Sequence, residues 1–460
     1  MKWNNLSLHK IKWICSFTVV LLPFFCSISN IFQKYLAVTL WAIMMWMFEL
    51  LPEEIVAIML PGLYILFDIT NYATAFSAWT TSTPWITLGG LMIGGMIVKS
   101  GLVLRIAYKS LLLTKGSLKG IVWGIVLTCT IFTPLIPSIM AKVALLVPVV
   151  IGICKVLKVE AKSATASALM LVVFFALWSP KMAFMTASTD SILTAGILEQ
   201  YLGVKITWLA WAKDMFIPGI LWMLVSIPLI YILRPQHLNL NKEYLKIEYR
   251  KLGKITIDEK KTVTLITALL ILLIFSSWHK LPEGVLMLGI GCLGFFPGIG
   301  LLKSDDFSKI QFKVVFFLAG AVTIGAVASS IGITESVINF VQPYFEQMNS
   351  YELVMSIYIF SILANFLLNP LAVIATLMIP IANLCSNLGY SATIGGYSMI
   401  MGFNQALFPY EIAPLMLVYG FGYLKLTHLI KVMVFRIVAG IIFMTVVTYP
   451  YWLYIGLLDK

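Results

Sequence analysis

Uninterrupted apolar runs constrain the fold of this chain more than any other feature. Many windows hold about 18 or more consecutive uncharged residues, the length that a helix needs to cross a bilayer. These runs do not alternate between apolar and polar residues, which excludes a β-barrel. Only 11% of the 460 residues are charged, too few to cover a soluble core of this size. The sequence therefore predicts an all-α polytopic membrane protein.

The apolar windows predict about eleven transmembrane helices and two re-entrant hairpins. Two regions, 118–157 and 350–388, are interpreted as hairpins because each has a break in its middle. The first window follows Lys2, Lys10 and Lys12 like a secretory signal, but it lacks a small-residue cleavage site and is expected to remain as a span. The predicted spans are 11–31, 35–51, 53–70, 84–113, 163–199, 212–234, 262–279, 282–300, 311–340, 393–424 and 427–456.

Short motifs recur in order at nearly one offset. Leu51–Glu53 recurs as Leu281–Glu283 after 230 residues, and Leu145–Val149 recurs as Leu377–Ile381 after 232 residues. A series of glycines, expected to serve close helix packing, recurs after 231 residues: Gly89, Gly94 and Gly101 match Gly320, Gly325 and Gly332.

This recurrence predicts a duplicated unit that is preceded by one extra span. We expect an N-terminal span over 1–33, a first repeat over 34–234, a polar cytoplasmic loop over 235–261 and a second repeat over 262–460. Each repeat has five full spans, and an odd number of spans inverts the second copy relative to the first.

The basic residues agree with this topology. When the N-terminus is placed inside, the cytoplasmic segments hold most lysines and arginines, as the positive-inside rule requires. The expected location is the cytoplasmic (inner) cell membrane, with a multi-pass chain and a cytoplasmic N-terminus. The basic clusters lie within 2–12, 105–119, 155–162, 242–261, 303–313 and 425–431.

Four breaks interrupt helices at corresponding places in the two repeats. Two are the hairpin tips, Pro134–Lys142 and Asn369–Ala372, and two lie in the broken helices 163–199 and 393–424. Backbone groups freed at membrane depth must be satisfied by protein, water, ion or substrate, and a helix N-terminus there favours an anion. Because such breaks are typical of secondary transporters, we expect all four to meet in one cavity.

Lys142 and Lys181 are the strongest individual candidates for functional residues, since both lie at breaks and away from the loops that set topology. Charges inside a membrane are costly and commonly functional, so these lysines are candidates for binding an anionic substrate. The structural alternative is an ion pair with Asp190 or Glu411. Nearby hydroxyls offer hydrogen bonds to a carboxylate or oxygen ligands to a cation: Ser138, Thr186, Ser188 and Thr189.

Three motifs resemble the divalent-anion:sodium symporter (DASS) family, bacterial relatives of solute carrier family 13. Glu49–Pro52 is similar to the family's Glu-Ala-x-Pro turn, and Gly101–Ile106 is similar to its Gly-Leu-x-x-Arg-Ile segment. Phe408–Leu415, followed by Tyr419–Gly422, is similar to its Phe-Pro-Tyr-x-x-Ala-Pro stretch. The resemblance implies eleven spans and two hairpins, a homodimer, and a transport domain that slides past a scaffold in an elevator-type transporter.

The resemblance also implies where substrate and sodium bind. In the family each hairpin tip carries Ser-Asn-Thr, which binds a substrate carboxylate and helps to ligate sodium, whereas here the tips read Ser138–Met140 and Pro370–Ala372. The expected substrate-binding residues are Ser138, Ile139, Met140, Lys142, Lys181, Thr186, Asn369, Pro370, Leu371, Ala372, Phe408 and Pro409. The expected cation-binding residues are Pro137, Ser138, Ser188, Asn369 and Ala372.

These features predict a secondary active transporter of small anions, di- or tricarboxylates first, by sodium-coupled symport or by anion exchange. Lys142 beside the altered tip would supply permanently the positive charge that sodium brings in the family, which favours exchange. Sulfate or another oxyanion is an alternative substrate. A cation/proton antiporter is an alternative function, with Asp190 and Glu411 as its carboxylate pair.

The remaining residue types favour no other class. Four isolated histidines and six scattered cysteines form no His-Glu-x-x-His motif and no metal-ligand spacing, so neither an enzyme nor a metal site is expected. No cofactor is expected, and Na⁺ is the candidate coupling ion. The expected partners are the small anion, a second copy of the chain and the lipid bilayer, and nucleic acid is not expected.

Overall fold

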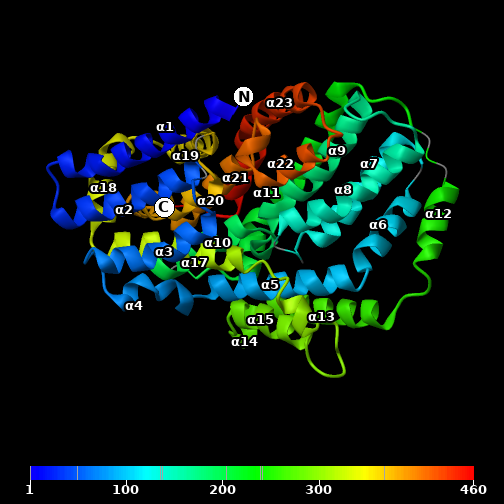
Figure 1. Ribbon diagram of the computed structural model, residues 1–460, viewed down its shortest axis with the longest axis horizontal. Coiled ribbons are helices and arrows are strands. Elements are labelled where there is room, and N and C mark those ends of the chain that lie inside the picture. The colour runs from blue at the N-terminus through cyan, green and yellow to red at the C-terminus, as the bar shows by residue number, and fades with distance from the viewer. Residues whose placement is uncertain are drawn as a thin grey trace.

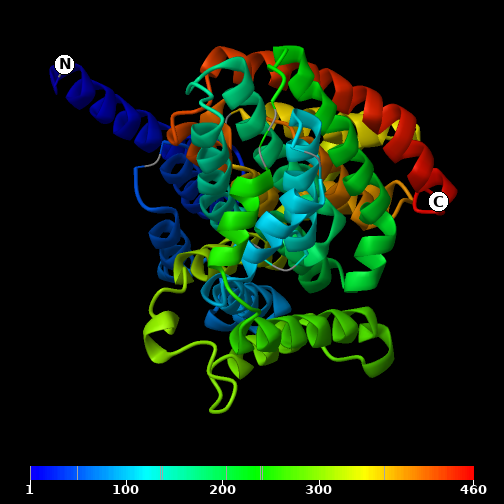
Figure 2. The same cartoon turned by 90° about the vertical axis from the view of Figure 1, so that its right-hand side faces the viewer.

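The computed structural model describes residues 2–48, 50–114, 116–134, 136, 138–203, 205–238, 240, 242–366 and 368–459. Within these ranges every regular element is a helix (Figure 1). The predicted all-α class is therefore confirmed. The first helix, α1, extends away from the rest of the chain, as Figure 2 shows.

The α-helices are numbered in chain order. Those of the first half are α1 (Lys2–Leu21), α2 (Asn30–Met47), α3 (Glu53–Leu66), α4 (Tyr72–Ala75), α5 (Ser82–Lys99), α6 (Leu102–Leu113), α7 (Leu118–Phe132), α8 (Ile139–Val156), α9 (Ala164–Trp178), α10 (Thr189–Leu202), α11 (Trp208–Ser226) and α12 (Lys242–Lys251). Those of the second half are α13 (Ile257–Ile274), α14 (Ser276–His279), α15 (Glu283–Leu293), α16 (Ser304–Phe307), α17 (Phe312–Ser330), α18 (Ile333–Val341), α19 (Ser350–Asn365), α20 (Pro370–Asn387), α21 (Ala392–Phe403), α22 (Ala413–Gly420), α23 (Leu426–Phe443) and α24 (Tyr449–Tyr454).

Six of the described helical segments are long and apolar enough to cross a membrane, and α5 with α6 makes a seventh if that bent pair is one span. By length and composition, the chain is therefore a polytopic membrane protein. The six segments are Ile139–Val156, Ala164–Ala183, Trp208–Leu233, Phe312–Ser330, Pro370–Asn387 and Leu426–Tyr454.

Gly101 and Gly332 lie at helix ends rather than at contacts between helices. The predicted span 84–113 is two helices, α5 and α6, which meet at 65°. Gly101 at this bend has φ +81°, and Gly332 between α17 and α18 has φ +78°, a left-handed conformation that ends a helix and that other residues rarely adopt. The prediction that these two glycines serve helix packing is therefore wrong.

Gly89 and Gly320 do serve close packing, as predicted. A Cβ atom at Gly89 would lie 2.3 Å from the backbone of Met287 in α15, and one at Gly320 would lie 2.3 Å from the backbone of Ala57 in α3. Backbone therefore packs on backbone where α5 meets α15 and where α17 meets α3. In Figure 1, α13 and α15 lie together along one side of α5.

A buried ion pair fastens the segment between the two halves. Arg105 Nε in α6 donates to Glu259 Oε1 in α13 at 2.5 Å, and the guanidinium also donates to carbonyl oxygens of residues 252–254. Burial opposes the charge of Glu259, but hydrogen bonds from Arg105 and Thr256 outweigh burial and lower the pKa of this carboxyl. Residues 252–254, which follow α12, are thus held against α6.

Candidate functional site

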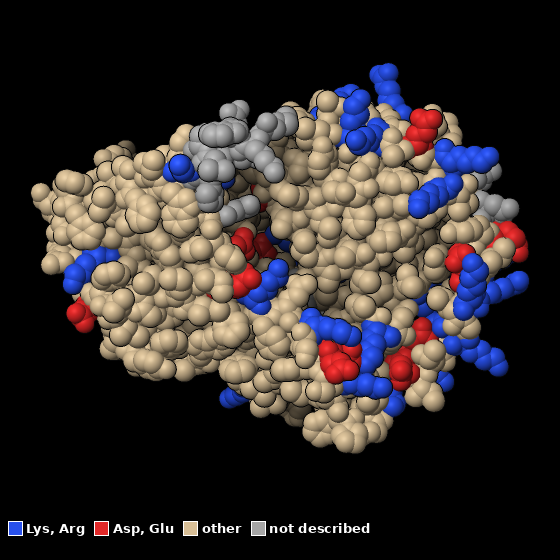
Figure 3. All heavy atoms as spheres, viewed as in Figure 1, with Lys and Arg blue, Asp and Glu red and all other residues tan. Residues whose placement is uncertain are grey.

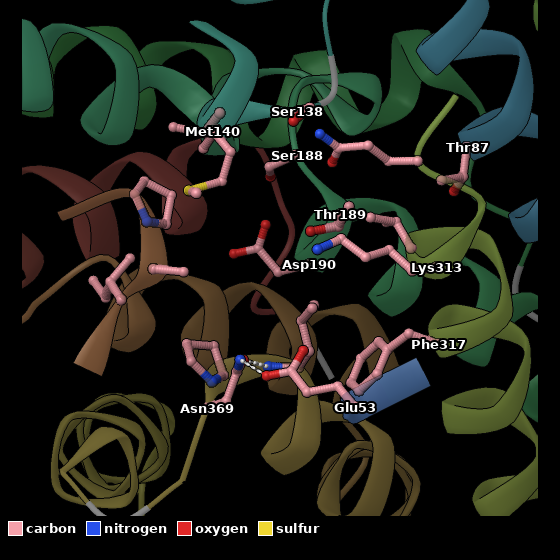
Figure 4. A pocket seen from close by; sticks show the side chains of 18 of the residues that line it. Glu53, Thr87, Ser138, Met140, Ser188, Thr189, Asp190, Lys313, Phe317 and Asn369 are labelled. Carbon is pink, nitrogen blue, oxygen red and sulfur yellow. Dashed lines mark hydrogen bonds between the residues drawn. The ribbon is translucent and has the colours of Figure 1, made fainter. Parts of the chain in front are cut away.

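One cavity of about 480 Å³ is lined by both hairpin tips and both broken helices. Figure 3 shows a central hollow with acidic and basic side chains at its mouth, and Figure 4 shows lining side chains at close range. The expected meeting of the four breaks is thus observed.

At each of the four breaks a helix begins at this cavity, and α3 also begins there with Glu53. The lining includes Ile139, Thr189, Pro370 and Ala413, which are the first residues of α8, α10, α20 and α22. A helix N-terminus has free N–H groups and carries about half of a positive charge. Four such ends that face one space create a field that favours an anion.

The first hairpin tip is fixed by hydrogen bonds within the hairpin and to the first broken helix. Ser138 Oγ accepts from the N–H of Ala141 at 3.2 Å and so caps α8. Thr186 Oγ1 donates to the carbonyl oxygen of Pro134 at 3.1 Å and accepts from Trp208 Nε1 at 3.1 Å. Thr186 therefore joins the hairpin to the broken helix without lining the cavity.

The second hairpin tip reaches a helix that the sequence analysis did not assign to the site. Asn369 Oδ1 accepts from the N–H of Leu371 at 2.9 Å and caps α20, whose first residue is Pro370. Asn369 Nδ2 donates to Glu53 Oε1 at 3.4 Å, as the dashed line in Figure 4 marks. The N-terminus of α3 thus lies against the tip.

The first broken helix contains a buried ion pair. After α9, residues 179–183 form a 3₁₀ turn that brings Lys181 to Asp190 in the first turn of α10, and the ammonium donates to Asp190 Oδ2. The same ammonium lies 3.4 Å from the ring centroid of Trp178. Asp190 Oδ1 also accepts from the N–H of Ser191 at 3.1 Å. All of these side chains except Ser191 line the cavity.

In the second broken helix, the Glu411 carboxylate accepts hydrogen bonds at the break. Its Oε1 accepts from the N–H of Phe408 at 2.7 Å and from that of Leu407 at 3.1 Å. Its Oε2 accepts from Asn365 Nδ2 of α19 at 3.3 Å. These bonds satisfy backbone donors that the break leaves outside a helix.

Arg436 of α23 ties the two broken helices together and was missed by the sequence analysis. It is fully buried and donates to Ser179 Oγ at 3.1 Å, to the backbone and side-chain oxygens of Asn404 at 2.6 Å each, and to Gln405 Oε1 at 3.2 Å. The signal that could have found it is an arginine well inside the predicted span 427–456, beyond the basic cluster at 425–431.

Lys142 lies beside the cavity rather than in its lining. Its ammonium is buried and donates to the carbonyl oxygens of Thr133, at 3.4 Å, and Ala187, at 3.3 Å. One carbonyl belongs to the first hairpin and the other to the first broken helix. The expected alternative of an ion pair applies to Lys181, and the part of the chain that the structure describes pairs Lys142 with no carboxylate.

The structure brings most of the predicted site residues into the lining and leaves others behind it. Those in the lining are Ser138, Ile139, Met140, Lys181, Ser188, Asn369, Pro370 and Leu371. Those outside it are Lys142, Thr186, Ala372, Phe408 and Pro409, while Pro137 lies outside the described residues.

Three further helices complete the lining: α3 contributes Glu53 and Glu54, and α5 contributes Thr87 and Leu91. α17 contributes Lys313, which extends toward Thr189 and Asp190 in Figure 4. The sequence analysis treated Lys313 only as a topogenic charge. The recurrence of Leu51–Glu53 was the available signal for α3.

Among the described residues, no group of three or more His, Cys, Asp and Glu side chains could hold a metal ion.

The fold and the cavity define a helical membrane protein whose site is built from helix breaks in both halves. Residues 4–458 match the family described as the sodium:sulfate symporter transmembrane region, and the chain belongs to this family. The resemblance to divalent-anion:sodium symporters is thereby confirmed.

Several curated relatives are similar to parts of the chain. Dicarboxylate transporter 1 of Spinacia oleracea chloroplasts is 27% identical over 48% of this chain and 40% of its own length. The L-tartrate/succinate antiporter of Shigella dysenteriae is 23% identical over 81% of this chain and 78% of its own length. The matches to the spinach protein, its Arabidopsis thaliana counterpart and a Cupriavidus necator membrane protein cover only 40%, 38% and 50% of those relatives.

We predict that Asp190→Asn destabilises the protein by about 3–5 kcal/mol, because it leaves the Lys181 ammonium buried without a counter-charge. The double variant Lys181→Met with Asp190→Leu should recover most of this loss. Thermal unfolding of the detergent-purified variants measures both effects. Lys251→Gln, which breaks an exposed ion pair with Glu248, is the matched control and should change stability by less than about 1 kcal/mol. Additive losses in the double variant would contradict an energetically coupled pair.

Proposed function

We propose that this protein is a secondary transporter of small anions, with di- and tricarboxylates as the first candidates. The observation that carries the proposal is the single cavity at which four helix N-termini meet, in a chain of the sodium:sulfate symporter family. The names of two relatives, a dicarboxylate transporter and an L-tartrate/succinate antiporter, support the substrate class. Sulfate is the alternative substrate that the family description suggests.

The cavity suits a small dianion in size and in donors. A volume of about 480 Å³ is in the range of small-molecule sites. One carboxylate of the substrate would accept from Ser138, Ser188 and the N-termini of α8 and α10. The other would face Asn369 and the N-terminus of α20. Lys313 supplies a lining ammonium outside the Lys181–Asp190 pair.

The two halves are proposed to be inverted repeats with the boundaries predicted above, eleven spans and an N-terminus in the cytoplasm. Contacts between corresponding helices support this arrangement: α3 packs on α17 as α15 packs on α5, and α10 packs on α20 as α22 packs on α8. In the proposed elevator mechanism of a homodimer, the hairpins and broken helices would carry the anion past α3, α5, α15 and α17.

The contacts of Lys142 favour anion exchange over sodium symport. Carbonyl oxygens at helix breaks are ligands that a hard cation such as sodium would use. Here the carbonyls of Thr133 and Ala187 already accept from the Lys142 ammonium, a cation that is covalently part of the chain. A carrier that keeps this ammonium when it is empty would be reluctant to cross the membrane without an anion.

The cation/proton antiporter alternative is less well supported. It would use Asp190 and Glu411 as its carboxylate pair, and both line the cavity. Asp190, however, is held by Lys181 in a buried ion pair.

A thermal-shift screen of the purified protein tests the proposed function. Succinate, malate, L-tartrate, citrate, sulfate and phosphate are each added with and without sodium. We expect dicarboxylates to raise the unfolding temperature, because a ligand at 100 times its Kd stabilises by about 2.7 kcal/mol, and acetate to have no effect. If none of these anions stabilises the protein in either condition, the proposed function is wrong.

Lys142→Gln tests the exchange mechanism. In proteoliposomes loaded with the anion, wild-type protein should exchange it without sodium. Loss of a charged hydrogen-bond donor costs about 1.5–3 kcal/mol, so the variant should exchange about tenfold more slowly or worse. Lys109→Gln, at an exposed lysine of α6, is the control. Uptake that needs a sodium gradient and survives Lys142→Gln would contradict exchange.

A further inference from the structure

The two buried carboxylates of the cavity differ in their partners. Asp190 and Glu411 are 4% and 6% exposed, and both line the same space. Asp190 is neutralised by Lys181. Glu411 accepts only from neutral donors, two backbone N–H groups and the amide of Asn365, and the described residues give it no ion pair. Glu411 is thus the buried lining carboxylate whose negative charge is not balanced by a neighbouring side chain.

The cavity has more carboxylates than ammonium groups. Glu53 and Glu54 join the two buried acids, whereas Lys181 and Lys313 are the lining cations. A dianion that binds here adds two negative charges to the cavity that Glu411 lines. Repulsion between such charges is strong at low dielectric, and the entry of a proton removes part of it.

A second observation concerns Asn365, the side chain that donates to Glu411. Asn365 is 2% exposed, and its amide nitrogen donates to both Glu411 Oε2 and the carbonyl oxygen of Gln405. Its Oδ1 atom is buried and has no hydrogen-bond partner among the described residues. A protonated Glu411 would bring an O–H donor to the side-chain amide that carries this unsatisfied acceptor.

Among the described residues, the elements packed around Glu411 bring no cation into an ion pair with its carboxylate. Behind Glu411, Asn365 also contacts Gln405, which accepts from the buried Arg436, and α19 carries the buried phenol of Tyr358. None of these groups forms an ion pair with Glu411 in the described structure. The charged groups that line the cavity with Glu411 are Glu53, Glu54, Lys181, Asp190 and Lys313.

We propose that Glu411 is a proton-binding site that is coupled to the anion. The inference rests on the proposed function, since it concerns the same cavity. A proton passes from water in the open cavity to a carboxylate oxygen of Glu411 as the dianion binds. It leaves when the anion is released on the other side. The anion therefore crosses the membrane together with a proton in each direction of the exchange.

Linkage makes this proposal measurable without transport. If a proton on Glu411 tightens anion binding, the bound anion increases the proton affinity of Glu411 by the same factor. Titration calorimetry at pH 7.5 in two buffers of different ionisation enthalpy gives the number of protons taken up per anion. Succinate and sulfate are the probes, because both are fully ionised at this pH. Wild-type protein should take up as much as about one proton per anion.

Glu411→Gln should abolish this proton uptake and make anion affinity independent of pH, since the amide mimics the protonated acid. Glu160→Gln, at an exposed carboxylate between α8 and α9, is the control and should keep the uptake. Infrared difference spectra of the wild type with sulfate add a readout that needs no variant. A new carboxylic C=O band should appear, since sulfate itself has none.

The results that would contradict the proton site differ from those that would contradict the proposed function. Anion binding without proton uptake, or uptake that persists in Glu411→Gln, overturns the proton site but leaves anion transport standing. Uptake that is lost in Asp190→Asn and kept in Glu411→Gln also overturns it. If the wild type binds neither succinate nor sulfate at any pH, the proposed function fails and the proton site fails with it.

Discussion

The structure depends on one constraint, the convergence of helix N-termini on a single space inside an apolar fold. α8, α10, α20 and α22 all begin at the cavity. Each of these ends has backbone donors that a lipid environment cannot satisfy, and each carries partial positive charge. The cavity exists because the chain breaks its helices there, and the same breaks make the space attractive to an anion.

Side chains hold the broken segments in place from behind. Arg436 joins the first broken helix at Ser179 to the second at Asn404 and Gln405. Lys142 joins the first hairpin to the first broken helix through two carbonyl oxygens. These cations satisfy acceptors that the breaks expose, which keeps irregular backbone stable at membrane depth. These two cations therefore help to fix the segments whose residues line the cavity.

Local sequence predicted the breaks, but it could not predict which side chains face the cavity. Prolines and polar residues in apolar runs mark helix ends, so Ser138 and Asn369 were found. Lys142 and Lys181 look alike in sequence, yet one turns behind the cavity and the other into it, since orientation depends on tertiary packing. The contact between Asn369 and Glu53 joins residues 316 positions apart, which no local pattern records. Likewise, a single apolar run hid the bend at Gly101.

The central claim is that both hairpin tips enclose one anion. Met140 and Leu371 line the cavity from the two tips, and each can be replaced by cysteine after Cys15, Cys26 and Cys292, the native cysteines that are not buried, are changed to serine. The measurement is the rate at which a membrane-impermeant thiol reagent modifies each cysteine as succinate is added. The account predicts that succinate slows both reactions with the same half-maximal concentration, while a cysteine at the exposed Glu160 is unaffected. Protection of one tip only, or at two different concentrations, would contradict a shared site.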